Sequence, residues 1–547
     1  MRRTAALVAL RRTALLLALT ATAAACGSDA QVTATTRSDA NTVSATVDAT
    51  GATAVDPTVA PTAATTLASP ADVEAAAAVG PYDIGTFDGR DLWVDPVHGD
   101  DGNDGSTREL ALRSVDAAWQ QIPSGDTLTT GYRLRLVAGT YPAADSVNYW
   151  EDRHGTASAP IIIEAADGPH TAVFEADMNV FGVSYLYLLG VDIIRDGDAF
   201  HCEQCDHILI RDGELSGGDD ATNGNGAHET VKINQSQYVY IEDNDIHGAD
   251  DNAIDFVAVQ YGHVTGNRIH DTVDWCMYTK GGSAYLDIVG NEVYDCGTGG
   301  VTAGQGTGFE FMRSPWLQYE AYGIRIVDNV VHDVEGAGLG VNGGYDVLLA
   351  HNTLYRVGAR SHVIEVVHGR RGCDGDVAAC TERHDAGGWG SADGEQPFIP
   401  NRHVYVFDNL VVNPPDAPSQ WQQFQIDGPL EPPAASGAPD PSLADDDLRI
   451  VGNVVWNGPA DHPLGTGDGC ADTNPTCSEA QIRADNAINT IEPVLVDPEH
   501  GDYRLTEASR AALPPTVAVP DFTWDDLPTG LPVPPGSTSN AQYTLPR

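Results

Sequence analysis

Short runs of alternating hydrophobic and polar residues, separated by Gly, Asn or Asp, fill the middle of this chain. No apolar stretch there is long enough for a buried helix. One phrase recurs as IEDNDIHGA, VTGNRIHDT, IVGNEVYDC, IVDNVVHDV and LAHNTLYRV, with echoes in VFDNLVVNP and IVGNVVWNG. Its asparagines are Asn244, Asn267, Asn291, Asn329, Asn352, Asn409 and Asn453. The first gaps between them are 23, 24, 38 and 23 residues, so the pattern indicates a repeat protein.

A unit of this length, with two or three short strands, cannot bury its apolar face alone, but stacked copies can. The pattern therefore predicts an all-β fold, a parallel β-helix, in which successive coils lie about 4.8 Å apart. The repeated asparagine suits a turn position and could form a ladder with the next coil. The longer gaps predict inserted loops around 304–322 and 369–400. A propeller needs nearer 40 residues per blade, and both it and a sandwich fit the spacing less well.

Strand alternation also predicts which side chains face outward. In HETVKINQ and DNAIDFVAV the outward residues are Lys232 and Asp255, each twelve residues before its repeat asparagine, so they should stack on adjacent coils. Lys280 lies eleven residues before Asn291, and a one-residue slip at its two following glycines would bring it onto the same column. The next coil, GGVTAGQG at 299–306, has little side-chain bulk and predicts a groove for a polymer.

Residues 92–141 and 497–513 resemble the opening and closing segments of secreted right-handed parallel β-helix proteins. The first runs from a strand through a Gly/Asp/Asn-rich loop and a short capping helix to a strand that ends in Gly-Thr-Tyr. The resemblance implies a right-handed, pectate-lyase-like β-helix domain over residues 88–515. It leaves the activity open, because such helices carry lyases, hydrolases, epimerases and adhesins.

The stretch DNAID resembles the calcium loop of family 9 polysaccharide lyases. Matched in order, Asp251 and Asp255 take carboxylate positions, and Asp250 could supply the charge that Asn252 lacks. In that family a lysine on the following coil is the base, which implies Lys280. YTKGGS also resembles the lysine strand of the alginate and chondroitin lyases with this fold, but their arginine on the next coil is missing, so Arg313 on the inserted loop is the candidate proton donor.

The chemistry of β-elimination explains why calcium belongs in this hypothesis. The proton next to a uronate carboxylate is acidic enough only when the anion is neutralised, and Ca²⁺ held by carboxylate oxygens does this. Without the ion, the aspartates would hold Lys280 protonated and unfit to act as a base. The sequence therefore predicts a calcium-dependent polysaccharide lyase that cleaves an acidic polysaccharide.

Two other functions stay open. A glycoside hydrolase on the same scaffold needs two carboxyl groups, and Glu229, Asp251, Asp255 and Asp274 offer enough of them. A non-catalytic, carbohydrate-binding surface protein is the third hypothesis. A mannuronan epimerase is less well supported, since its Asp-Pro-His-Asp signature is absent. Candidate substrate-binding residues are Lys232, Gln305, Trp316, Arg370 and Arg371. Structural roles compete with these: Lys232 as a salt-bridge partner of Asp255, and Trp316 as a loop anchor.

The charge of the chain limits its partners. It has 78 Asp+Glu against 29 Lys+Arg, a formal net charge of −49. Such a surface repels nucleic acid and anionic membranes, and polyanionic sugars too unless a local cation reverses the field. We expect no nucleic-acid partner, and a monomer.

The N-terminal segment predicts export. Residues 1–25 have the arginines, apolar run and small residues of a signal peptide, and AAAC resembles a lipobox that would lipidate Cys26. Residues 26–87 read as a disordered Ala/Thr-rich stalk and residues 516–547 as a Pro-rich tail. The expected location is secreted, as a cell-surface or outer-membrane lipoprotein attached to the membrane only through its lipid.

The eight other cysteines suit an oxidising compartment. Two pairs, each seven residues apart, predict local disulfides, and a CxxC pair is either a short-range disulfide or simply buried. The two seven-residue pairs are Cys373 with Cys380 and Cys470 with Cys477, and the CxxC residues are Cys202 and Cys205. The pairing of Cys202, Cys205, Cys276 and Cys296 stays open.

Overall fold

The computed structural model describes residues 80–195, 197–218, 228–390, 395–523, 526–528, 530–532 and 540. The predicted signal peptide, the lipidation site Cys26 and most of the predicted stalk lie outside these residues. No helix within the described ranges has the length and apolar character needed to cross a membrane.

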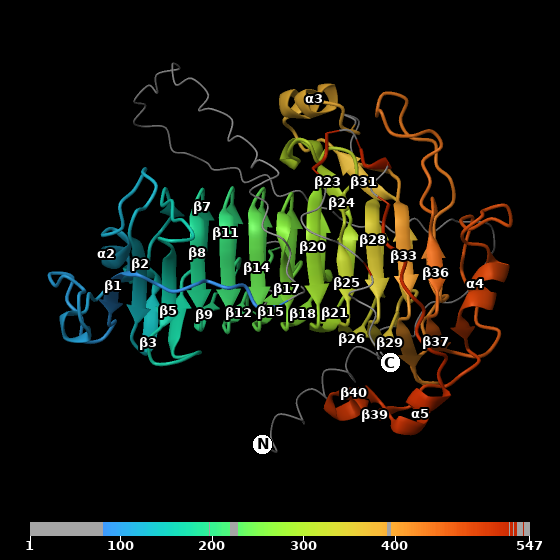
Figure 1. Cartoon of the computed structure of the whole chain (residues 1–547), viewed down its shortest axis with the longest axis horizontal. Helices are drawn as coiled ribbons and strands as arrows, with labels where there is room; N and C mark the ends of the chain where they lie inside the picture. Colours follow the sequence, from blue (N-terminus) through green and yellow to red (C-terminus); the bar gives the residue numbers. More distant parts are fainter. Residues whose placement is uncertain are drawn as a thin grey trace, which may run out of the picture. The chain divides into compact units, whose positions relative to one another are not determined.

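The described chain winds through three long parallel sheets, so that successive coils add one strand to each (Figure 1). The 13-stranded sheet contains β1 (Gly89–Val94), β2 (Gly131–Leu136), β5 (Ile161–Ala165), β8 (Ser184–Leu189), β11 (Asp206–Arg211), β14 (Gln237–Glu242), β17 (Gln260–Thr265), β20 (Ser283–Val289), β24 (Ala321–Tyr322), β25 (Arg325–Val327), β28 (Gly344–Ala350), β33 (Arg402–Phe407) and β36 (Arg449–Val451). The 10-stranded sheet contains β4 (Trp150–Glu151), β7 (Met178–Phe181), β10 (Phe200–Glu203), β13 (Val231–Asn234), β16 (Ile254–Val257), β19 (Trp275–Lys280), β22 (Gly299–Gly304), β27 (Ala337–Asn342), β30 (Ile364–Val367) and β35 (Phe424–Ile426). The 12-stranded sheet contains β3 (Gly139–Pro142), β6 (Ala172–Glu175), β9 (Val191–Ile194), β12 (Glu214–Ser216), β15 (Asp245–Ala249), β18 (Arg268–Thr272), β21 (Glu292–Cys296), β26 (Val330–Val334), β29 (Thr353–Val357), β34 (Leu410–Asn413), β37 (Val454–Asn457) and β38 (Ala487–Ile488). The predicted right-handed parallel β-helix is confirmed.

The core runs along the inside of the coils. In the 10-stranded sheet one inward column pairs Val231, Ile254, Met277 and Val301 in register, and all four are fully buried. Because each coil contributes the same inward positions, apolar side chains stack coil after coil, and this burial is the main stabilising term.

The predicted asparagine ladder lies at the turn between the 13-stranded and 12-stranded sheets. Each side-chain oxygen accepts the backbone N–H of the asparagine one coil earlier, as from Asn244 to Asn267 (2.9 Å) and from Asn267 to Asn291 (3.0 Å). The ladder continues through Asn329, Asn352, Asn409 and Asn453 and ends on Asn486, which the repeat pattern had not included. It satisfies buried backbone donors where the chain turns.

Both ends of the domain extend further than predicted. Tyr82 stacks on Tyr240 (4.1 Å between ring centroids), and Ile84 and Phe87 pack beside it, so residues 80–87 belong to the folded domain rather than to a stalk. At the other end Phe522 is buried in a cluster with residues of β28 and β33, so the domain does not end at residue 515.

Short helices and two small sheets complete the fold. The predicted capping helix is α2 (Val115–Trp119), whose Trp119 meets Trp150 edge to face at the open end of the core. The small sheets are β23 (Gly306–Gly308), β31 (Gly369–Gly372) and β32 (Gln396–Ile399), and the hairpin β39 (Leu495–Asp497) with β40 (Asp502–Leu505). The other helices are α3 (Val377–Asp385), α4 (Glu479–Asp485) and α5 (Glu507–Ala512), with 3-10 turns at Arg108–Leu110, Ala143–Asp145, Phe309–Phe311 and Pro498–His500.

All eight cysteines after Cys26 form disulfides: Cys202–Cys205, Cys276–Cys296, Cys373–Cys380 and Cys470–Cys477. The two predicted seven-residue loops are confirmed. The open pair joins adjacent coils, because Cys276 lies on β19 and Cys296 on β21.

Candidate functional site

The outer face of the 10-stranded sheet carries two columns of outward side chains. In the first, Lys232 pairs with Asp255 on the next coil, as predicted. The following position is Tyr278, and Lys280 pairs with Val257 in the second column. The predicted column position of Lys280 is therefore wrong. The register between β16 and β19 is continuous, and the extra residue of this coil falls after β19, so Lys280 lies two residues further along the strand on the same face as Asp255.

The glycines after Lys280 serve the turn rather than an open groove. Gly281 and Gly282 have φ angles of 66° and 84°, which favour glycine, and a Cβ on Gly282 would lie 2.3 Å from the carbonyl oxygen of Trp316. On the next coil a Cβ on Gly299 would lie 2.3 Å from the ring of Trp275. The small residues thus let the inserted loop and Trp275 pack closely, and the predicted bare groove at 299–306 is covered.

Lys280 is held over an aromatic ring at the end of β19. Its Nζ donates to the hydroxyl of Tyr278 (3.0 Å), lies 4.1 Å from the ring centroid and is 3.4 Å from Oε1 of Gln305. Tyr278 is almost completely buried, and burial together with the charges of the surrounding carboxylates raises its pKa well above the usual value. Gln305, a predicted substrate-binding residue, therefore lies beside Lys280.

Asp251 and Asp274 lie at equivalent positions of two adjacent coils, just before β16 and β19. The backbone N–H of Asp274 donates to the carbonyl of Asp251 (3.1 Å). Burial raises the pKa of Asp251 to about 7, with further contributions from the charges of Asp274 and Glu229, while Lys280 acts in the opposite direction. Both aspartates remain partly exposed, so this pair of like charges is accessible from solvent.

A more deeply buried group lies beside it. Nζ of Lys232 is 2.9 Å from Oε1 of Glu229 and 3.8 Å from Oδ2 of Asp255, so the predicted salt bridge to Asp255 is present. Burial and the charge of Asp255 raise the pKa of Glu229 to about 7, despite Lys232. Oδ1 of Asp255 is buried and accepts no hydrogen bond within the described residues, which is costly unless a ligand group meets it.

The three aspartates predicted as calcium ligands point to different partners. Asp250 lies 3.7 Å from Nδ1 of His228, Asp255 lies 3.8 Å from Nζ of Lys232, and Asp251 interacts electrostatically with Asp274. Across the described ranges, no three carboxylates bring one oxygen each within 4.8 Å of one another. Two groups that meet this distance each include both cysteines of a disulfide. The donors have suitable chemistry, but their oxygens are not gathered around one point, and the calcium loop stays a prediction.

Three other predicted residues have structural contacts. Trp316 is buried among Tyr285, Tyr319 and Tyr322, so it anchors the inserted loop and cannot stack on a sugar. Arg371 is fully buried and paired with Glu320, which also excludes it as a substrate contact. The exposed Arg313 donates to the carbonyl of Gln235 (2.8 Å), next to the end of β13.

Of the predicted binding residues on the inserted loops, Arg370 stays exposed. Its Nε lies 3.6 Å from Oε1 of Glu395. Its position on β31, beside β23, leaves it available to a ligand.

Glu320 is a residue that sequence reasoning missed. It accepts hydrogen bonds from Nε and Nη2 of Arg371 (2.8 and 2.6 Å), from Oγ1 of Thr307 (2.7 Å) and from the backbone N–H of Gly281 (2.9 Å). One buried carboxylate thus ties the turn after Lys280 to two inserted strands. No periodic pattern marks it, because it lies within an insertion. Tyr278 was also missed, although its position two residues before Lys280 places it on the same face.

Residues 179–354 match the family model of the right handed beta helix region. Among curated proteins no match was found. Similar solved structures include the A-module of mannuronan C-5 epimerase AlgE4 from Azotobacter vinelandii (12% identity, 65% of this chain and 94% of that one, TM-score 0.38) and pectate lyase Pel9A (14%, 73% and 83%, 0.38). Another is the GH136 lacto-N-biosidase from Eubacterium ramulus (11%, 74% and 68%, 0.35). With TM-scores below 0.5 these structures carry no argument about this chain. Its sheet topology and the family model together show a right-handed parallel β-helix.

Proposed function

We propose that this protein is a glycan-cleaving enzyme that hydrolyses glycosidic bonds on the outer face of its 10-stranded sheet. The observation that carries the proposal is the stacked pair of Asp251 and Asp274, in which the pKa of Asp251 is raised to about 7. A carboxyl group with such a pKa holds a proton near neutral pH and can donate it to a leaving oxygen.

The spacing of the coils suits this chemistry. Adjacent parallel strands are about 4.8 Å apart, and glycosidases that retain the anomeric configuration hold their two carboxyl groups about 5–5.5 Å apart. In the proposed reaction Asp251 protonates the glycosidic oxygen and Asp274 attacks the anomeric carbon. Water then releases the sugar, with Asp251 acting as the base. Lys280 and Gln305, on the same face, would bind sugar hydroxyl groups.

The charge of the protein favours a neutral glycan. The site adds Glu229 and Asp255 to the proposed pair, and the chain carries a net charge of −49. A uronate would be repelled by this field unless a bound cation offset it.

The test is an assay of new reducing ends over a panel of neutral polysaccharides. Asp251→Asn and Asp274→Asn should each lower kcat at least about 1000-fold with unchanged circular dichroism. Asp116→Asn, an exposed aspartate on α2, is the matched control and should leave turnover intact. Reducing ends that persist in both site variants would remove the proposal.

A calcium-assisted lyase acting on an acidic polysaccharide is the second candidate, and the contact between Lys280 and Tyr278 favours it. A lysine beside a phenol supplies two proton-transfer groups on one face, with Arg313 as a further candidate donor. This reaction would leave an unsaturated product that absorbs ultraviolet light. We would conclude that the protein is a lyase rather than a hydrolase if this absorbance appears with pectate or alginate. The absorbance should then disappear when a chelator is added and in Lys280→Ala.

We also propose that the enzyme works outside the cytoplasm. The four disulfides support an oxidising compartment. A lipid on Cys26 would then hold the β-helix at the cell surface. Metabolic labelling with a fatty acid should mark the full-length protein and should not mark Cys26→Ser.

A further inference from the structure

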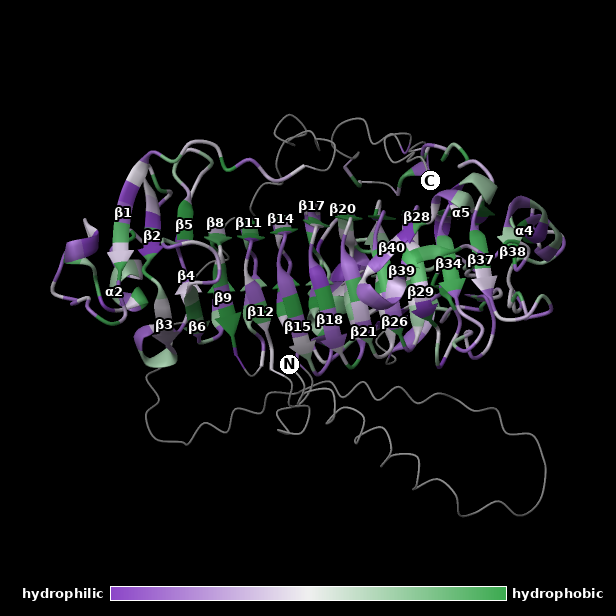
Figure 2. Cartoon of the chain, turned by 90° about the horizontal axis from the view of Figure 1, so that it is seen from below, coloured by the Kyte–Doolittle hydropathy of each residue, from purple (hydrophilic) through white to green (hydrophobic). Residues whose placement is uncertain are grey.

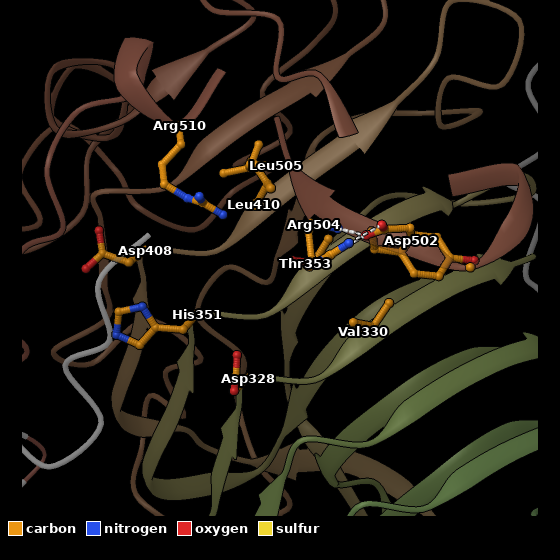
Figure 3. A pocket seen from close by; sticks show the side chains of 12 residues that line it. Asp328, Val330, His351, Thr353, Asp408, Leu410, Asp502, Arg504, Leu505 and Arg510 are labelled. Carbon is orange, nitrogen blue, oxygen red and sulfur yellow. Dashed lines mark hydrogen bonds and ion pairs between the residues drawn. The ribbon is translucent and has the colours of Figure 1, made fainter. Parts of the chain in front are cut away.

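A separate pocket lies at the turn between the 13-stranded and 12-stranded sheets. Asp251 and Asp274, which form what we call the carboxylate face, lie instead where the chain enters the 10-stranded sheet. The volume of the pocket is about 540 Å³, and Figure 3 shows it between the turn of the asparagine ladder and the C-terminal hairpin. Figures 1 and 2 both place β39, β40 and α5 against β26 and β29 of the 12-stranded sheet. The hairpin is fixed there by a buried cluster that includes Leu495, Leu513 and Val412, so the pocket has a firm roof.

The floor of the pocket is built from equivalent positions on three successive coils. Asp328, His351 and Asp408 each precede a ladder asparagine and have φ angles of 54–57°, which turn their side chains outward from the coil. Next to this row Val330, Thr353 and Leu410 pair in register on β26, β29 and β34. The floor therefore combines carboxylates and a hydroxyl group with apolar side chains.

The roof adds cationic groups. Arg504 is paired with Asp502 through two hydrogen bonds (2.7 and 2.5 Å). Arg510, on α5, extends over the pocket toward His351 and Asp408 (Figure 3). Within the described residues Arg510 has no carboxylate within 4.0 Å, which leaves its guanidinium free to donate hydrogen bonds.

The mixture of charges decides which ligand fits. An anion would be repelled by the carboxylates of Asp328 and Asp408, and a cation would be repelled by the guanidinium of Arg510. An apolar molecule would desolvate all of these groups without compensation. A neutral, hydroxyl-rich ligand can donate to the exposed Asp328 and accept from Arg510 and Thr353, while the apolar floor contacts its C–H surface. Asp408 is buried and accepts the backbone N–H of Val517 (2.8 Å), so it adds charge to the floor rather than an acceptor.

We infer that this pocket is a second carbohydrate-binding site, which takes a short stretch of a neutral glycan and is separate from the site of cleavage. The inference goes beyond the proposed hydrolysis. It would let the enzyme hold one part of a polymer while the carboxylate face works on another, which raises the effective concentration of substrate.

Calorimetry on the full chain carrying Asp274→Asn tests the inference, because cleavage is then blocked and only binding is measured. The probes are cello-, manno-, xylo- and malto-hexaose and, as the anionic arm, hexagalacturonate. At least one neutral hexaose should bind, and Arg510→Ala should weaken its binding at least tenfold. Thr353→Val should weaken it several-fold. Arg483→Ala, an exposed arginine of α4 paired with Glu479, is the control and should have no effect.

Three outcomes would overturn the inference: no neutral hexaose binds, binding ignores both pocket substitutions, or hexagalacturonate binds better and depends on Arg510. Turnover of Arg510→Ala on an otherwise native chain keeps the two proposals apart. If hydrolysis is present and requires Asp274 while the pocket binds nothing, the proposed function stands and this inference fails. If the pocket binds a glycan but no hydrolysis is found, the reverse holds.

Discussion

The outer face of the 12-stranded sheet and the turns that lead into the 10-stranded sheet are built on the same coils, yet they arrange charge in opposite ways. On the 12-stranded sheet the sign alternates along one column, from Asp245 to Arg268 to Glu292. Arg268 lies 2.8 Å from Asp245 and 3.6 Å from Glu292. On the 10-stranded side the sign repeats, since Asp251 is followed by Asp274.

The consequence appears in the acidities of the carboxyl groups. Although burial raises the pKa of Asp245, the hydrogen bond from His270 and the nearby positive charges lower it overall. The pKa of Glu292 is also lowered, chiefly by its contact with His332. The pKa values of Asp251 and Glu229 are instead raised, to about 7 each. One face is stabilised by its charges, whereas the other holds charges that cost stability, as functional sites often do.

Aromatic stacking strengthens the same contrast. On the 12-stranded sheet His247, His270, Tyr294 and His332 stack ring on ring, with centroids 4.4–4.9 Å apart. These rings cover each other and leave little surface for a ligand. On the 10-stranded sheet Tyr278 stacks on no neighbouring ring of its own column within the described residues and instead contacts Lys280.

The largest expected effect comes from giving the carboxylate face the alternating pattern of the other face. Asp274→Arg should remove hydrolysis, by at least about 1000-fold in kcat, and should lower the pKa of Asp251 because an opposite charge replaces a like one. The reducing-end assay measures the first effect. If Asp274→Arg stays active, the repeated sign has no catalytic meaning.

The second effect concerns a buried carboxylate that is fully paired. Glu320→Ala leaves Arg371 buried without its partner, and we expect a loss of about 3–5 kcal/mol in the free energy of unfolding. Glu320→Gln keeps part of the hydrogen bonding and should cost less. Urea titration followed by tryptophan fluorescence measures both. A loss below about 1 kcal/mol in Glu320→Ala would show that the insertions do not depend on this pair.

The repeat in the sequence predicted some of these contacts correctly and others not. The repeat period was enough to place Lys232 beside Asp255 and to predict the asparagine ladder. It misplaced Lys280, because the extra residue in the 24-residue gap lies in the turn at Gly281–Gly282, after β19, and counting back from Asn291 crosses that turn.

The insertions were beyond periodic reasoning altogether. Trp316 and Arg371 were predicted as binding residues because they lie on inserted loops, which are usually exposed. Both are buried, and this burial depends on how β23 and β31 pair in space. The raised pKa of Asp251 could not be predicted from the sequence either, because it arises from burial and from charged neighbours on other coils. Loops without a repeat have no register from which contacts can be predicted.

A smaller effect should separate the faces by their response to pH. The pKa of Glu229 in the folded protein, about 7, lies above its ordinary value of 4.5, so the folded state binds the extra proton between these pH values. The free energy of unfolding therefore falls as pH rises through this window. Glu229→Gln, which keeps an acceptor for Lys232, should be more stable than the native protein at pH 8 by up to about 3 kcal/mol and nearly equal to it at pH 4. Thermal unfolding at the two pH values measures this, and a variant that follows the native pH dependence would contradict it.

The smallest effect tests the face where charges pair well. Burial lowers the pKa of His270, but hydrogen bonds to Asp245 and Asp271 outweigh this and raise it to about 9, above the ordinary 6.5. The stabilisation is complete below pH 6.5 and is lost as pH rises through 9. His270→Gln should therefore cost about 1 kcal/mol at pH 6 and almost nothing at pH 10, with a smaller loss in high salt. His384→Gln, at an exposed histidine of α3 without an ion pair among the described residues, is the matched control and should change stability at neither pH. If His270→Gln loses the same stability at both pH values, ring stacking rather than charge holds this face together, and the contrast with the carboxylate face would rest on Asp251 and Glu229 alone.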